Sequence, residues 1–388
     1  MQKDFHYYAT YCAARIAGYS HEEGLEICYS SQLTDWCSVT FLKKLKGPKA
    51  AATTQLPLEL ADSGSDILSL QNITRIWSSF HFLPYDLNAD VKRAGQLYKN
   101  KYRLICKPNG ALVEDTVKLA KGRGMQAVGL AMHVVADTWA HSGFAGTPSL
   151  VINNTDWYFY ELLSGEDGEA ERLVRFRHSP TAADDTEQGI YTNSVYQGSE
   201  NSIMNLGHGR AGHLPDYSFA RYKYLPAWGD YEMIVKDNPS DYYNAFCQMI
   251  SAMHFLRGDA EDFVCGIYDT ESVKPWEERI RAILVKRQLD ACPDWKALSE
   301  EMAGCEIEDF DLNRYEEEYL TADREEKNNT FLGRYFLAAM AQKSMVTGKI
   351  FLSGSLLAGF SADYTKKGFR GIRDYRDLVE FMRGRNGE

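Results

Sequence analysis

The stretch MQAVGLAMHVVADTWAH, residues 125–141, decides the fold expected of this chain. It contains no proline, and small and aliphatic residues recur along it as they do in a buried helix. His133, Asp137 and His141 are four residues apart, so their side chains share one face of that helix. The same apolar pattern extends back to residue 114, and we predict one continuous helix over 114–141.

This polar stripe needs partners, because burying polar groups without them costs several kcal/mol. At a rise of about 1.5 Å per residue, His133 and His141 are about 12 Å apart along the axis. A single ion bound at zinc–nitrogen distances of about 2.0–2.1 Å cannot reach both rings. Asp137 lies midway and has two oxygens. The spacing therefore indicates either two or more metal ions in a row that share Asp137, or a polar face satisfied by water and hydrogen bonds.

Helical signals dominate the rest of the chain. Ser20 and Glu23 fit a capping box at the start of a helix. Residues 150–160 are a weak candidate for extended structure, and residues 178–240 carry the Gly, Pro, Ser, Asn and Tyr of a long looped excursion, which is usually functional. Further helices are predicted over residues 4–17, 89–105, 241–257, 276–290 and 329–346.

We therefore expect an all-α fold. Its metal-binding core spans residues 1–257 and includes the loops at 178–240. A helical extension over 258–388 packs on that core, unless the whole chain is one continuous domain.

Composition narrows the class of protein. The 388 residues include 43 Lys and Arg against 54 Asp and Glu, a net charge of −11, which disfavours a sequence-independent nucleic-acid binder. An enzyme that binds an anionic substrate through metal ions is still possible, because bound cations can reverse the sign of the electrostatic field in the site. We find no signal-peptide pattern, no apolar run near the roughly 20 residues of a transmembrane helix, and no CxxC among the eight cysteines. These features predict a cytoplasmic protein with reduced thiols.

Other potential ligands are spread along the chain. Early in the sequence they are Asp4, His6, Asp35 and His81. Later, a glycine-rich loop carries His208, His213 and Asp216, and its glycines let the backbone approach an ion or ligand closely.

The ordered set resembles the zinc-dependent phospholipase C superfamily, which includes the trinuclear-zinc single-strand nucleases. Those proteins are all-helical and present an early His, an Asp, a His, a helical HxxxD with a trailing His, and a later His with a carboxylate. The resemblance covers residues 1–220 and implies an intracellular branch of the superfamily. It matches its metal ligands to His6, Asp35, His81, His133, Asp137, His141, His213 and Asp216.

Three features depart from that superfamily. Its mature enzymes begin at a Trp whose amine binds metal, whereas this sequence starts with Met1-Gln2, and we expect Asp4 to substitute. The gap from Asp137 to the trailing histidine is short. The last pair is spaced HxxD, with His208 as a competing ligand.

The resemblance implies Zn²⁺, as two or three ions, and hydrolysis of a small-molecule or lipid phosphoester by metal-activated water. Ligand type alone leaves Fe, Mn and Ni as alternatives. Asp137 would be catalytic through the metal and Asp35 would be the base, with Arg210, Tyr7 and Trp36 at the substrate. The alternative is a non-catalytic helical binding module with a structural or degenerate metal site. The ExxH pairs of di-iron bundles, HExxH, Walker A and GxSxG are all absent from the sequence.

Overall fold

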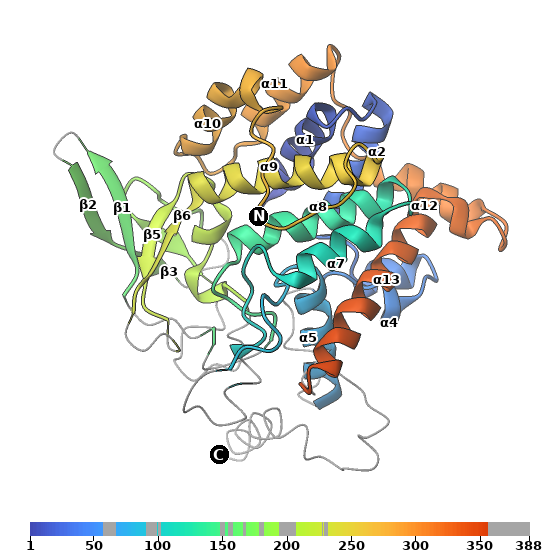
Figure 1. Ribbon diagram of the computed structural model, residues 1–388, viewed down its shortest axis with the longest axis horizontal. Coiled ribbons are helices and arrows are strands. Elements are labelled where there is room, and N and C mark those ends of the chain that lie inside the picture. The colour runs from blue at the N-terminus through green and yellow to red at the C-terminus, as the bar shows by residue number, and fades with distance from the viewer. Residues whose placement is uncertain are drawn as a thin grey trace.

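The computed structural model describes residues 1–56, 67–90, 99, 102–147, 152–153, 158–165, 168–177, 182–193, 207–226, 228 and 232–355. Helices surround a central helix, α8, and a small sheet stands at one side of the molecule (Figure 1). The helix predicted over residues 89–105 lies mostly outside the described residues.

Helix α8 (Met125–Ala140) is the centre of the helical core. All of its residues from Gln126 onward are buried, as expected of a helix that is apolar on nearly every side. It packs against α2 (His21–Leu33), α9 (Asn238–Arg257) and α13 (Phe331–Leu352). The histidine and aspartate stripe therefore points into the protein interior rather than into water.

The predicted continuous helix over 114–141 is wrong in one respect. Two helices occupy this stretch, α7 (Ala111–Ala120) and α8, and the chain turns between them. Gly122 and Gly124 have φ angles of 72° and 85°, a region that glycine adopts without the steric penalty of a Cβ. The apolar periodicity continues across this turn, which is why the pattern alone does not reveal the break.

The N-terminal segment begins with a π-helical turn, η1 (Asp4–Ala9), and continues as α1 (Thr10–Ile16). π-helical turns are rare in proteins, and those that occur are often found at functional sites. The next helix, α2, starts as predicted: Ser20 and Glu23 form both hydrogen bonds of the capping box.

The predicted all-α class is wrong, because a four-stranded antiparallel sheet has the order β2-β1-β5-β6 and a parallel pair joins β3 to β4. Tyr222 and Tyr224 alternate with more exposed neighbours on β5, but four residues are too few for a reliable period-2 signal. Several strands fall inside the stretch predicted as loops. Their bounds are β1 (Tyr160–Gly165), β2 (Gly168–Leu173), β3 (Arg175–Arg177), β4 (Ile190–Thr192), β5 (Arg221–Tyr224) and β6 (Ile234–Asp237).

The buried residues form two clusters that meet near α8. The larger one holds the helices, and the smaller, largely aromatic one lies under the sheet and includes Phe82 and Phe144. Phe82 follows His81 in the chain and stacks on His141, with 4.6 Å between ring centroids. The histidines around α8 are therefore supported by the sheet as well as by the helices.

The remaining helices complete the core, and α13 packs against both α8 and α5. The division of the chain into two parts at residue 257 stays a prediction.

No helix among the described residues is both long and apolar enough to cross a membrane. The other bounds are α3 (Val39–Lys44), α4 (Lys49–Ala52), α5 (Ile67–Phe80), η4 (Gly209–Ala211), η5 (Leu214–Asp216), η6 (Lys274–Trp276), α10 (Glu277–Val285), α11 (Cys292–Ala303), α12 (Leu312–Thr321) and η7 (Lys327–Asn329).

Candidate metal centre

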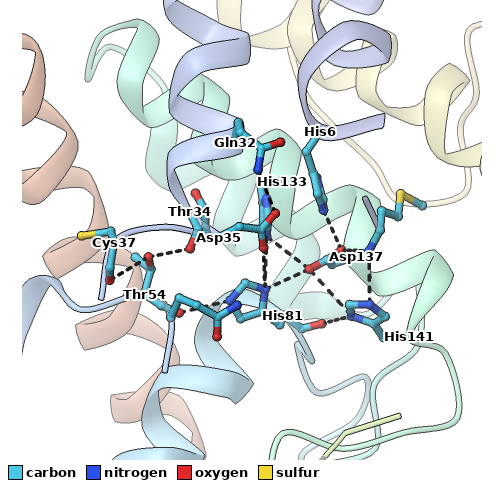
Figure 2. Close-up of polar contacts among 12 residues, drawn as sticks. His6, Gln32, Thr34, Asp35, Cys37, Thr54, His81, His133, Asp137 and His141 are labelled. Atoms are coloured by element: carbon cyan, nitrogen blue, oxygen red, sulfur yellow. Dashed lines mark hydrogen bonds and ion pairs between the residues drawn. The ribbon is translucent and has the colours of Figure 1, made fainter. Parts of the chain in front are cut away.

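Asp137 stands at the centre of a cluster of histidines that come from separate parts of the chain (Figure 2). Its carboxylate is 1% exposed, and its two oxygens serve different neighbours. Oδ1 lies 3.1 Å from His6 Nε2, whereas Oδ2 lies 3.1 Å from His81 Nδ1 and 3.2 Å from His133 Nε2. A carboxylate reached on both oxygens by imidazole nitrogens is arranged to be shared between two neighbouring cations.

Three groups of side chains have the ligand atoms and the spacing to hold a metal ion. Each group offers ligand atoms that all lie within 4.8 Å of one another. The first ligand group is Asp35, His81 and His133; the second is His6, His133 and Asp137; the third is His141, His208 and Asp216.

The donor atoms around the first ligand group have nearly tetrahedral spacing. His81 Nδ1, His133 Nε2 and Asp137 Oδ2 are 3.1–3.2 Å apart, and Asp35 Oδ1 lies 3.9 Å from both histidine nitrogens. Zinc–ligand bonds of about 2.0–2.1 Å place the corners of a tetrahedron about 3.3 Å apart. The three distances among the two histidine nitrogens and the Asp137 oxygen therefore already fit an ion, and a small inward movement of Asp35 would supply the fourth corner.

Three of these histidines are held by a hydrogen bond from their second ring nitrogen to a backbone carbonyl. His81 Nε2 lies 3.1 Å from the oxygen of Thr54, and His141 Nδ1 lies 2.7 Å from the oxygen of His81. His208 Nδ1 lies 2.9 Å from the oxygen of Gly212. Because a carbonyl only accepts, each of these nitrogens carries the proton, and the other nitrogen presents its lone pair to the cluster. Metal-binding histidines are typically oriented in this way.

His6 reaches the cluster from the π-helical turn η1. Its ring stacks on His133 with 3.8 Å between centroids, and it is fully buried. Nδ1 of His6 has no hydrogen-bond partner among the residues that the structure describes, and the same holds for Nδ1 of His133, whereas Nε2 of His6 faces Asp137 Oδ1 at 3.1 Å. The Nε2 atoms of both rings face Asp137, so these are the nitrogens that would bind a metal ion at this site.

The α-amino group of Met1 lies between the second and third ligand groups. Its nitrogen is 2.9 Å from Asp137 Oδ1, 3.2 Å from Asp216 Oδ1 and 3.3 Å from His141 Nε2. Burial lowers the pKa of this amine, but the carboxylates of Asp137, Asp216 and Asp35 outweigh burial and raise the pKa to about 11. The carboxylates thus create a strongly cation-attracting position next to the third group.

Charge in the cluster is divided between neutral histidines and ionised carboxylates. Burial lowers the pKa of His6, His133 and His208 to about 4, so these rings are neutral near pH 7 and each has one nitrogen lone pair available. Burial raises the pKa of Asp137 and Asp216, but the nearby histidines and the Met1 amine lower it well below the usual range. Deprotonated ligands of both kinds are what a divalent metal requires.

Close helix packing brings Asp35 to this cluster. Asp35 follows the end of α2, and α2 can lie against α8 because Gly129 has no side chain: a Cβ there would be 2.1 Å from the carbonyl oxygen of Ile27. The Asp35 carboxylate is 24% exposed, the highest value in the first ligand group, and burial raises its pKa. It therefore forms the solvent-facing side of that group.

Other residues singled out in the sequence lie outside the three groups. Asp4 is buried and accepts a hydrogen bond from Phe5 N, and burial raises the pKa of Asp4 to about 6. The hydroxyl of Tyr7 donates to the carbonyl of Glu308, away from Asp137. The structure also places His213, Trp36 and Arg210 outside the groups: His213 contacts Asp184, Trp36 stacks on Phe310, and Arg210 lies in η4.

Two groups near the site were missed at the level of sequence. The resemblance pointed to an N-terminal amine, but the sequence led us to assign that place to Asp4 and not to Met1. Asp184 lies in a polar stretch of the sequence. It is not separated from any histidine by a short spacing that would indicate a shared site.

A protein-family model matches residues 1–350 of the 388-residue chain. The matched model is DUF6765, a family of unknown function. The chain belongs to this family. No curated protein and no solved structure matches it. All members of the three ligand groups fall within the DUF6765 match, but the match assigns no activity to them.

Proposed function

We propose that this protein is a metal-dependent hydrolase of phosphoester bonds, related to the zinc-dependent phospholipase C and nuclease superfamily. The observation that carries the proposal is the set of three donor atoms, His81 Nδ1, His133 Nε2 and Asp137 Oδ2, at mutual distances of 3.1–3.2 Å. A structural hydrogen-bond network does not need three acceptor-capable atoms converging on one point.

The donor set supports zinc as the metal. Imidazole nitrogens and carboxylate oxygens are common ligands of Zn²⁺, and the three groups contain histidine and aspartate but no cysteine. The first and second groups are linked by Asp137, whose Oδ1 faces His6 and whose Oδ2 faces His81 and His133, so they fit a pair of neighbouring ions of which His133 would bind one, and the third group fits one more. Bound divalent ions supply a water of lowered pKa and neutralise charge that builds up on phosphoryl oxygens.

The protein's own residues have distinct tasks in this proposal. Asp137 fixes the distance between the first two positions through its two oxygens. Asp35, on the solvent-facing side, would accept the proton of the attacking water through the carboxylate oxygen that is not turned toward the histidines. Trp36 is 40% exposed beside Asp35, and Trp36 and Arg210 remain the proposed contacts for substrate.

The first prediction tests the metal centre. Protein purified without added metal is analysed for transition metals by mass spectrometry, together with Asp137→Asn and a control, Asp259→Asn. Asp259 is an exposed carboxylate that contacts His254 and Arg257, outside the three groups. We expect at least one tightly held ion in wild type and in the control, and loss of most of it in Asp137→Asn, because the amide lacks the shared charge.

Activity is then measured on a panel of phosphodiester, phosphomonoester, phospholipid and nucleotide substrates. We expect hydrolysis that a chelator abolishes, that added zinc restores, and that Asp137→Asn lowers by about 100-fold or more, since both linked positions depend on it. Wild type that contains no metal and binds none on titration would refute the metal centre. Wild type that holds metal but hydrolyses nothing in the panel would refute the hydrolase and favour the non-catalytic binding module.

A further inference from the structure

Thr54, which follows α4, belongs to none of the three ligand groups, but it is bonded to two segments that carry ligands. Its backbone oxygen lies 3.1 Å from His81 Nε2. Its hydroxyl donates to the oxygen of Thr34 at 2.7 Å, and its backbone nitrogen donates to the oxygen of Cys37 at 3.0 Å. These two carbonyl groups stand on either side of Asp35 in the chain (Figure 2). Thr54 therefore connects the Asp35 segment to His81.

Asp35 and His81 are the members of the first ligand group that α8 does not carry. His133 and Asp137 are one turn apart on α8, so the helix itself fixes the spacing between them. The distances from Asp35 and His81 to these partners depend instead on how two other segments are held. Asp35 Oδ1 is 3.9 Å from the nearest nitrogens of His81 and His133, and a change in either segment would alter both distances.

Helix α13 holds Thr54 from the side away from the ligands. The hydroxyl of Tyr335 lies 3.1 Å from Oγ1 of Thr34 and 3.4 Å from Oγ1 of Thr54, and it donates to these oxygens. Each threonine hydroxyl donates its own proton to a backbone oxygen, that of Ser30 for Thr34 and that of Thr34 for Thr54. The Tyr335 side chain is fully buried, so water does not compete for these bonds.

A second contact of α13 reaches the helix that leads to His81. Gln342 follows Tyr335 by seven residues, or two turns, and therefore lies on the same face of α13. Its side-chain nitrogen donates to the oxygen of Ser79 at 3.1 Å. Ser79 is in the last turn of α5, two residues before His81. One buried face of α13 is thus bonded to the segments on both sides of the His81 ring.

We infer that Thr54 is a positioning residue of the first ligand group and that Tyr335 holds Thr54 in place. The inference rests on the metal centre of the proposed function. Because the Thr54 oxygen accepts the Nε2 proton of His81, it leaves Nδ1 as the atom that faces Asp137. Because the Thr54 hydroxyl is bonded to the residue before Asp35, it also limits how far that carboxylate can move.

The test measures Co²⁺ binding to folded protein that a chelator has stripped of metal. The d–d absorption of Co²⁺ reports each bound ion, and His81→Gln identifies the class of site that the first ligand group forms. We expect Thr54→Val, which removes the bond to the Thr34 oxygen, to raise the Kd of that class by about 10–100-fold and to change its spectrum. Thr54→Ser keeps the hydroxyl and should stay close to wild type.

Tyr335→Phe tests the support from α13. The ring keeps its volume, and both threonine hydroxyls keep their own donor bonds, so the variant should fold. We expect it to raise the same Kd by about threefold to tenfold, as the loss of one neutral hydrogen bond does. In the double variant with Thr54→Val, the loss should be smaller than the product of the two single losses, because Tyr335 acts through Thr54.

The matched control is Tyr19→Phe, which removes another buried tyrosine hydroxyl, one that donates to the oxygen of Met253 at 3.3 Å. It should leave every Kd unchanged, whatever it does to stability. Unchanged affinity in Tyr335→Phe and Thr54→Val, or equal weakening of every class of site, would overturn the role of Thr54. If Thr54→Val does not fold, the comparison of Tyr335→Phe with Tyr19→Phe decides alone.

The same titration separates this inference from the proposed function. Wild type that binds Co²⁺ but hydrolyses no ester would refute the hydrolase and leave the positioning role of Thr54 standing. Wild type that binds no Co²⁺ would refute the metal centre, and this inference with it.

Discussion

At the scale of single residues, burial of ionisable groups at the candidate site has opposite consequences for histidines and for acids. His6, His133 and His208 have pKa values near 4 in the folded chain, below the ordinary value of 6.5. Between these values the unfolded chain binds protons that the folded chain does not, so these histidines lower stability as the pH falls. Asp4 acts in the other direction, because its pKa is raised from 3.8 to about 6 and the folded chain holds its proton in the same range.

The metal-free protein should therefore lose stability as the pH falls from about 6.5 toward 4.5, with three histidines of lowered pKa outweighing Asp4, Asp35 and His213, whose pKa values are raised. Asp4→Asn keeps an oxygen for the hydrogen bond from Phe5 N and removes one opposing titration. We expect its stability to fall more steeply than that of wild type. Urea unfolding in chelator at pH 6.5 and pH 5 measures the two slopes; parallel slopes would contradict the assignment of a raised pKa to Asp4.

At the scale of elements, the position of α2 against α8 decides whether Asp35 meets the histidines. Gly129 lies one turn before His133, and a Cβ there would meet the Ile27 oxygen at 2.1 Å and Ser30 Cβ at 2.7 Å. Backbone atoms cannot rotate out of the way as the end of a long side chain can. Any side chain at this position must separate the two helices.

Gly129→Ala is expected to lower the free energy of unfolding by about 1–3 kcal/mol, because the cost of overpacking exceeds the gain in helix propensity. It should also weaken metal binding, since α2 carries Asp35. The matched control is Gly348→Ala in α13, where nothing lies within 4 Å of the added Cβ. There we expect a gain of up to about 1 kcal/mol and unchanged metal content. Denaturant unfolding with metal analysis measures both, and a neutral Gly129→Ala would mean that the helices can separate freely.

The elements show what sequence patterns can and cannot predict. The start of α2 followed from Ser20 and Glu23, because a capping box is a local interaction between residues close in sequence. The break between α7 and α8 did not, because Gly122 and Gly124 interrupt the backbone without interrupting the apolar periodicity. The sheet was missed for a related reason: its strands are short, and their stability comes from pairing partners far away in the chain.

The candidate site divides in the same way. His133, Asp137 and His141 were placed together from spacing alone, because one helix positions them all. The pairing of His208 rather than His213 with Asp216 depends on the path of the loop, which spacing does not determine. The Met1 amine was missed because a backbone group has no residue type to recognise.

At the scale of the whole molecule, the three ligand groups connect η1, the segments that follow α2 and α5, helix α8 and the loop that carries η5. A metal that binds only this folded arrangement stabilises it by mass action, by about 4 kcal/mol when the free metal is a thousand times its Kd. Removing the metal with a chelator should lower Tm by several degrees, and adding Zn²⁺ should restore it.

Thermal unfolding of wild type and Asp137→Asn, with and without chelator, measures this effect. The variant should start near the Tm of chelated wild type and respond little to either addition. A wild-type Tm that is the same in chelator and in zinc would show that the ligand groups do not carry a stabilising ion.

The distance along the chain between ligands also governs when the centre forms during folding. His6 and Asp137 are 137 − 6 = 131 residues apart, and His141 and Asp216 are 216 − 141 = 75 apart. Contacts this remote form late, because the entropy of closing such large loops must be overcome first. A metal ion therefore meets a complete site only near the end of folding, and its main kinetic effect is to slow unfolding rather than to accelerate folding.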